Sequence, residues 1–108
     1  MNDTFQRSPL LLLSGRANLS LASEISNLLG EEIEGCATIE DFADGEIFVR
    51  INRDVRGRDV FIIQPTVSPT GSIMELLLLI DAAVRASAAR VTAVVPYYGY
   101  GRQDRKDQ

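Results

Sequence analysis

The sequence predicts an α/β fold built on a mostly parallel, doubly wound sheet from which a β-hairpin projects. Short apolar runs alternate with longer amphipathic segments, which is the order typical of strands joined by helices. The runs contain few polar residues, as expected for parallel strands covered on both faces. Between two β-prone segments stands Asp44-Gly45, a strong short-range signal for a hairpin.

The first strand and helix are predicted within residues 10–30. Leu10–Leu13 is a continuous apolar run that ends at Ser14-Gly15, which suits a strand buried on both faces. We expect Asn18 to cap a helix that runs to about Leu29, and Gly30 to end it. One stripe of this helix should face a core, because its apolar residues follow helical spacing at Leu21, Ile25, Leu28 and Leu29.

The hairpin is predicted from the next segment. Ala37–Phe42 and Glu46–Ile51 flank Asp44-Gly45, and we expect a type I′ turn, in which both central residues have positive φ. The second strand should be half exposed, because apolar residues occupy every other position, at Ile47, Val49 and Ile51.

The remaining residues predict strand, helix and strand. Val60–Ile63 is a second apolar strand. Ser72-Ile-Met-Glu75 matches the capping box, in which the serine accepts from a backbone N–H and the glutamate reaches back. We therefore expect a helix from Ser72 to about Ser87. Val91–Val95 is predicted to be a third buried strand.

Length and composition restrict the class of protein. The 108 residues suffice for one domain or part of one; residues 1–8 are polar and are expected to be a flexible tail, so residues 9–108 carry the fold. The net charge of -4 argues against non-specific nucleic-acid binding. With no histidine and a single cysteine, Cys36, the chain lacks the residues for a zinc or haem site and for a Ser-His or Cys-His nucleophile. No apolar run is long enough to cross a bilayer, so we expect a cytoplasmic location.

The last predicted strand suggests that the domain is incomplete. Val91–Val95 is apolar on both faces, yet no helix follows to cover it. A parallel strand at a bare C-terminus would expose apolar surface and unpaired backbone groups. We interpret the chain as a domain truncated before its end.

The segment after this strand is the most informative for function. Tyr97–Lys106 combines tyrosines, glycines and cations at the carboxyl end of a strand, where ligands bind in doubly wound sheets. Arginine stacks on purines and binds phosphate through its planar fork. These residues taken alone also fit a solvated basic loop, so both interpretations stay open at this point.

The order of residues in this segment matches a known family signature at nearly every position. Tyr98–Lys106 reads Tyr-Gly-Tyr-Gly-Arg-Gln-Asp-Arg-Lys, and it resembles the Tyr-Gly-Tyr-Ala-Arg-Gln-Asp-Arg-Lys signature of ribose-phosphate pyrophosphokinases. The resemblance covers nearly the whole chain from Ser14 onward, in the order of the family, through Phe42–Glu46, Val55–Gly57, Asp59–Gln64 and Met74–Leu77.

The resemblance implies a fold and an activity. The fold would be the N-terminal part of the first of two phosphoribosyltransferase-like domains. The activity would be a ribose-phosphate diphosphokinase, a transferase of nucleotide biosynthesis that moves the β,γ-diphosphoryl group of ATP onto the anomeric hydroxyl of ribose 5-phosphate. The products are AMP and 5-phosphoribosyl 1-diphosphate. Magnesium is the cofactor, and the subunits form homo-oligomers, usually hexamers.

The resemblance also implies residues that bind ATP. The residues on the hairpin would complete the ATP site of a neighbouring subunit. Phe42 would stack on the purine, and the carboxylates would accept hydrogen bonds from its exocyclic amine. The residues after the last strand would contact ATP, with Arg102 packing on the adenine. The set is Phe42, Asp44, Gly45, Glu46, Arg102 and Gln103, with Asp104, Arg105 and Lys106 as further candidates. A hairpin turn alone also accounts for Asp44-Gly45.

No catalytic or metal-binding residue is expected in this chain, because the family's metal, catalytic and pentose-phosphate segments follow the position of Lys106. We therefore expect the 108 residues alone to be inactive. Two alternatives remain: a non-catalytic, synthetase-associated regulatory homologue, and a free-standing nucleotide-binding module.

Overall fold

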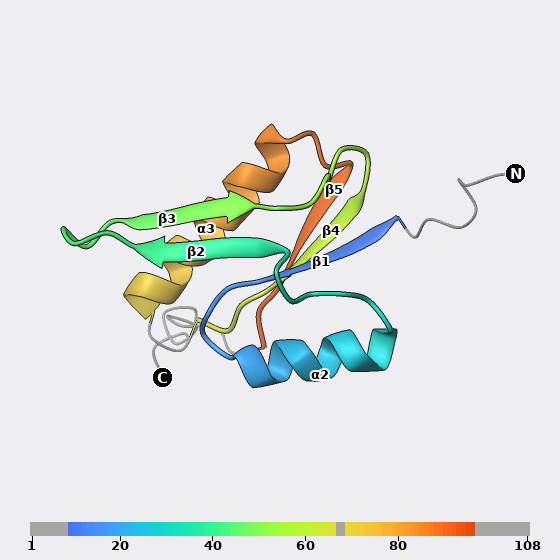
Figure 1. Ribbon diagram of the computed structural model, residues 1–108, viewed down its shortest axis with the longest axis horizontal. Coiled ribbons are helices and arrows are strands. Elements are labelled where there is room, and N and C mark those ends of the chain that lie inside the picture. Colours follow the sequence, from blue (N-terminus) through green and yellow to red (C-terminus); the bar gives the residue numbers. More distant parts are fainter. Residues whose placement is uncertain (1–8, 67–68, 97–108) are drawn as a thin grey trace, which may run out of the picture.

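The computed structural model describes residues 9–66 and 69–96, with side chains for all of these except residues 69 and 70. Along the chain the elements alternate between strands and helices (Figure 1). They are β1 (Leu10–Ser14), α2 (Leu19–Leu29), β2 (Ala37–Asp41), β3 (Ile47–Ile51), β4 (Asp59–Ile63), α3 (Pro69–Arg85) and β5 (Arg90–Val94).

The main sheet is parallel and has the strand order β1-β4-β5. In its register Ser14 of β1 lies opposite Ile63 of β4, which lies opposite Val94 of β5. The carboxyl ends of the strands are therefore level at one edge of the sheet, the edge where parallel α/β sheets bind ligands. The predicted parallel sheet is confirmed.

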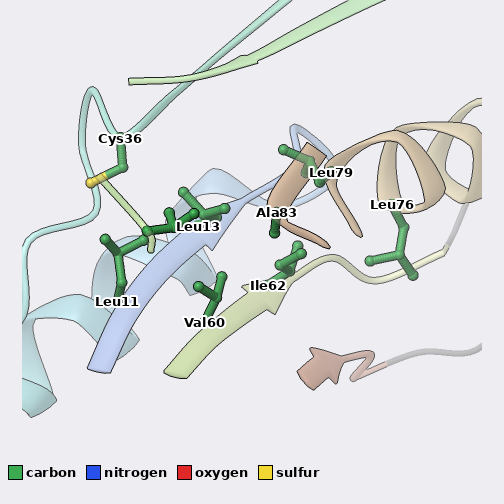
Figure 2. Packing of buried hydrophobic residues seen from close by; sticks show 9 residues of the cluster. Leu11, Leu13, Cys36, Val60, Ile62, Leu76, Leu79 and Ala83 are labelled. Carbon is green, nitrogen blue, oxygen red and sulfur yellow. The ribbon is translucent and has the colours of Figure 1, made fainter. Parts of the chain in front are cut away.

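One face of this sheet packs against α3 and the hairpin. Because successive side chains of a strand point to opposite faces, Leu11 and Leu13 of β1 share this face with Val60 and Ile62 of β4. Figure 2 shows these side chains on the same side of the sheet as Leu76, Leu79 and Ala83 of α3, with which they form one cluster. The buried cluster consists of Leu11, Leu13, Cys36, Val55, Val60, Ile62, Leu76, Leu79 and Ala83.

The opposite face packs against α2, so helices cover both sides and the sheet is doubly wound, as predicted (Figure 1). An apolar hollow of about 290 Å³ lies on this face, lined by Leu10, Leu12, Ile25, Leu29, Phe61, Ile63 and Val94. The helix α2 contacts mainly the edge strand β1. It therefore leaves part of the face uncovered.

The predicted ends of α2 are confirmed, but its apolar stripe is only partly so. Asn18 Oδ1 accepts from the Leu21 N–H at 3.0 Å, and Gly30 ends the helix with φ of 68°. Within the stripe Leu28 is 86% exposed, because α2 reaches little of the sheet beyond β1.

The predicted capping box of α3 is wrong. The helix begins at Pro69 rather than Ser72, and proline suits a first helical position because its φ is already helical and it has no N–H to leave unpaired. Glu75 consequently lies inside the helix instead of at its first turn. Its carboxylate is free to contact other parts of the molecule.

The strand β5 is less buried than predicted. Val91 and Val94 are half-buried and Ala93 is exposed, because β5 is an edge strand of the described sheet and α2 lies over the other edge.

Within the described residues, no helix is long and apolar enough to cross a membrane.

Candidate functional site

The hairpin β2–β3 extends beyond the body of the domain (Figure 1). Its strands pair antiparallel from Ala37↔Ile51 to Asp41↔Ile47. One face carries Ile39, Val49 and Ile51, which pack against the core. The predicted alternation of buried and exposed positions is confirmed only in part: Arg50 is exposed between Val49 and Ile51, but Phe48 is half-buried like its neighbours. The hairpin is anchored along one face while its tip stays clear of the body.

The turn at the tip differs from the predicted type. The Phe42 N–H donates to Glu46 O at 2.7 Å, and the Gly45 N–H donates to Phe42 O at 2.9 Å. The central residues are therefore Ala43 and Asp44, and Gly45 follows them with φ of 95°. This is a three-residue loop in which a turn is followed by a left-handed glycine, whereas type I′ would need positive φ at Asp44.

The turn gathers the predicted hairpin residues and exposes them. Phe42 is 49% exposed, and its ring centroid lies 5.9 Å from that of Phe48. Asp44, Gly45 and Glu46 are exposed, and Asp44 Oδ1 accepts from the Glu46 N–H at 3.1 Å. An exposed aromatic ring beside two carboxylates has the groups needed to stack on a base and accept from its amino group.

The other predicted ATP-binding residues lie outside the described residues. These are Arg102, Gln103, Asp104, Arg105 and Lys106. Their roles therefore stay predictions.

A polar network that the sequence did not predict lies at the carboxyl edge of the sheet. Gln64, directly after β4, is fully buried. Its Nε2 donates to Ser72 O and to Glu75 Oε1, both at 3.2 Å, while its Oε1 accepts from the Ala17 N–H at 3.1 Å. The Gln64 side chain thus ties α3 to the loop that follows β1.

Arg16 occupies the centre of this network. Its Nε and Nη2 donate to Glu75 Oε2 at 2.9 and 2.7 Å, and its backbone N–H donates to Glu75 Oε1 at 2.9 Å. The Glu75 side chain is only 9% exposed. A carboxylate this buried needs such partners, because an unpaired charge in the interior costs several kcal/mol, about 3–5 when one partner is removed.

Arg16 also reaches the hairpin. Its Nη1 and Nη2 donate to Asp41 Oδ2 and Oδ1 at 3.1 and 2.8 Å. The hydrogen bonds from Arg16 lower the pKa of the Asp41 carboxyl, and those carboxylate contacts raise the pKa of the Arg16 guanidinium. The pair is therefore present at neutral pH, and its contribution is lost only as the pH falls through the lowered pKa of Asp41.

Gly15 makes this arrangement possible. A Cβ at this position would lie 2.3 Å from the Gln64 amide, so any other residue would displace a buried and hydrogen-bonded side chain. The sequence carried two partial signals of the network: a glycine directly after a buried strand, and a glutamate beside the apolar run of α3.

Comparison with known proteins first defines the class of fold. The structure matches a crystal structure of purine phosphoribosyltransferase from Pyrococcus horikoshii with a TM-score of 0.58 and 20% identity, over 85% of this chain and 65% of that chain. At this identity the likeness concerns the fold alone. The class is a phosphoribosyltransferase-like α/β domain, and this chain carries an antiparallel hairpin beside its parallel sheet.

The family follows from the sequence. The profile of the N-terminal domain of ribose phosphate pyrophosphokinase matches residues 10–108, so the chain belongs to the ribose-phosphate pyrophosphokinase family. Relatives include ribose-phosphate pyrophosphokinase 1, chloroplastic, of Oryza sativa subsp. japonica, which is 53% identical over 99% of this chain. The ribose-phosphate pyrophosphokinase of Chlorobaculum tepidum is 52% identical over 94% of the chain.

A solved structure agrees with this assignment. Phosphoribosylpyrophosphate synthetase from Mycobacterium smegmatis matches with a TM-score of 0.83 and 42% identity over 93% of this chain. The chain spans 33% of that protein and 26% and 31% of the rice and Chlorobaculum relatives. The comparisons therefore concern the N-terminal part of these proteins.

Proposed function

We propose that the intact protein is a ribose-phosphate diphosphokinase. In this reaction the anomeric hydroxyl of ribose 5-phosphate attacks the β-phosphorus of ATP and loses its proton. The bond between the β-phosphorus and the oxygen that bridges to the α-phosphate breaks, so AMP leaves and 5-phosphoribosyl 1-diphosphate forms. Membership of the family supports this proposal.

The observation that carries the ATP-binding role is the hairpin tip. Its Phe42 residue is 49% exposed, although burial of an aromatic side chain is worth about 2–3 kcal/mol. A purine base stacked on this ring would cover it. We assign the tip to the ATP site of a neighbouring subunit in a homo-oligomer, a hexamer by family resemblance, with Asp44 and Glu46 as acceptors for the adenine amino group.

Arg102 and Gln103 supply the second part of the proposed ATP site, from the neighbouring subunit's own body. Arg102 packs on the adenine, and Gln103 contacts the nucleotide. Asp104, Arg105 and Lys106 are proposed as further contacts from the same segment of the sequence. Each site would thus combine a hairpin from one subunit with residues 102–106 of another.

Magnesium belongs to the proposed reaction, where it neutralises the charge of the polyphosphate. In the described part of the chain, no group of His, Cys, Asp and Glu side chains is arranged to hold a metal ion, and we assign no step to magnesium here.

A cytoplasmic location remains part of the proposal; the rice relative is named chloroplastic.

The test is an assay of the full-length protein with ATP, magnesium and ribose 5-phosphate. We expect AMP and 5-phosphoribosyl 1-diphosphate to form in equal amounts, because one diphosphoryl group moves per turnover. A properly oligomeric protein that binds ATP and forms neither product would contradict the proposal. That result would favour the regulatory homologue instead.

A further inference from the structure

Within the described residues, Arg16 joins two parts of the molecule, the helix α3 and the hairpin, that also meet through apolar packing. On one side it holds Glu75, the buried carboxylate of α3. On the other it holds Asp41, the last residue of β2. Asp41 precedes Phe42 directly, so this ion pair joins the hairpin to the body at the position next to the proposed base-stacking ring.

The hairpin needs such a link. A two-stranded ribbon alone is marginally stable in water, and the apolar contacts of this one lie along its strands, at Ile39, Val49 and Ile51. The tip itself, from Phe42 to Glu46, is exposed. The tip contacts described above, between Phe42 and Phe48 and between Asp44 and Glu46, lie within the hairpin itself, so they do not fix the hairpin relative to the body.

Arg16 is itself held in place before it reaches the hairpin. Its backbone N–H and two of its guanidinium nitrogens are bound to Glu75, and Gln64 fixes the same carboxylate from the other side. The planar guanidinium then presents Nη1 and Nη2 to both oxygens of Asp41. This geometry depends on arginine, because an ammonium group has no comparable fork.

We propose that Arg16 is a positioning residue that orients the hairpin for ATP binding. The inference rests on the proposed function, in which Phe42 stacks on adenine. Arg16 acts through Asp41 on the placement of Phe42 and does not itself touch the nucleotide.

The test uses the full-length protein with Asp41→Asn and, separately, Arg16→Lys. Asp41→Asn is the cleaner variant, since the Asp41 side chain is 60% exposed and the contact between Arg16 and Glu75 is retained. We expect each variant to raise the KM for ATP about two- to fivefold, the range for loss of a largely exposed ion pair. The KM for ribose 5-phosphate should stay unchanged.

The matched control is Glu40→Gln. Glu40 is the preceding residue of the same strand, is exposed, and makes no ion pair within the described residues. Its substitution changes the net charge by the same amount without touching Arg16. We expect both KM values to remain those of the wild type.

A double-substitution test asks whether the effect passes through Phe42. Because Asp41 is proposed to act by placing this ring, adding Asp41→Asn to Phe42→Ala should cause no further rise in the Kd for ATP. Fully additive effects would show that Asp41 and Arg16 act on ATP independently of the hairpin, and would overturn the proposal.

Hydrogen exchange provides a readout that does not depend on ATP. In Asp41→Asn the hairpin amides of residues 37–51 should exchange several-fold faster than in Glu40→Gln, while the amides of β1 and β4 are unchanged. Unchanged hairpin exchange would refute the positioning role whatever the enzyme does. Failure of the wild-type protein to form product would refute the proposed function instead, so the two failures are distinguishable.

Discussion

Replacing Glu75 with alanine should lower the free energy of unfolding of this domain by about 2–4 kcal/mol, because several charged hydrogen bonds are lost and buried donors are left unpaired. The Glu75 carboxylate accepts from Arg16 Nε and Nη2, from the Arg16 backbone N–H and from Gln64 Nε2. Native-state hydrogen exchange of the β1 and β4 amides measures the effect within the full-length protein.

The matched control for Glu75→Ala is Asp81→Ala. Asp81 is an acid of the same helix, but its side chain is 60% exposed, and its ion pair in the described part of the chain is with Arg85, one turn along. Its loss should cost less than about 0.5 kcal/mol. If Glu75→Ala destabilises the domain no more than Asp81→Ala does, the network at the sheet edge contributes no stability.

Replacing Arg102 with alanine in the full-length enzyme should raise the Kd for ATP about 10- to 100-fold, since a stacked base is worth roughly 1–3 kcal/mol. A lost charge-assisted contact adds to this effect. The affinity for ribose 5-phosphate should change little, because Arg102 is assigned to the adenine. Calorimetric titration with each substrate measures the two affinities separately.

Two comparisons sharpen the Arg102 result. Arg102→Lys keeps the charge but loses the planar group, so it should recover only part of the ATP affinity. Arg85→Ala removes an arginine whose side chain is 76% exposed and paired with Asp81, and it should leave ATP binding unchanged. An equal loss of affinity for both substrates in Arg102→Ala would indicate a structural role for Arg102.

Features set by neighbouring residues were predicted well from the sequence. The cap at Asn18, the ending glycine at Gly30 and the existence of the hairpin are all confirmed. Each depends on residues a few positions apart along the chain. The order of strands and helices was predicted for the same reason, because apolar runs and their spacing report local structure.

Features that depend on distant partners were missed. Glu75 was interpreted as a capping residue, but its partner Arg16 is 59 positions away, and no local pattern identifies such a pair. The burial of β5 was overestimated because a strand's own sequence does not show which face its neighbours cover. The turn type at Asp44 was wrong because one Asp-Gly pair fits both a two-residue and a three-residue loop.

In the candidate site, too, the residues of the hairpin tip were predicted and the distant contacts that support them were not. The hairpin residues came from the family resemblance, and the structure brings Phe42, Asp44, Gly45 and Glu46 together on one exposed turn. Their support by Arg16 and Asp41 was not predicted, because it joins the loop after β1 to the end of β2. That contact exists only once the sheet and α3 are assembled.

The most direct test of the shared ATP site is a mixing experiment with full-length Phe42→Ala and Arg102→Ala. Each variant alone should fold, assemble and be nearly inactive. In mixed oligomers some sites combine an intact hairpin from one subunit with an intact Arg102 from another, so we expect a fraction of the synthetase activity to return. If subunit exchange is demonstrated and no activity returns, Phe42 and Arg102 act within one chain, and the shared site is wrong.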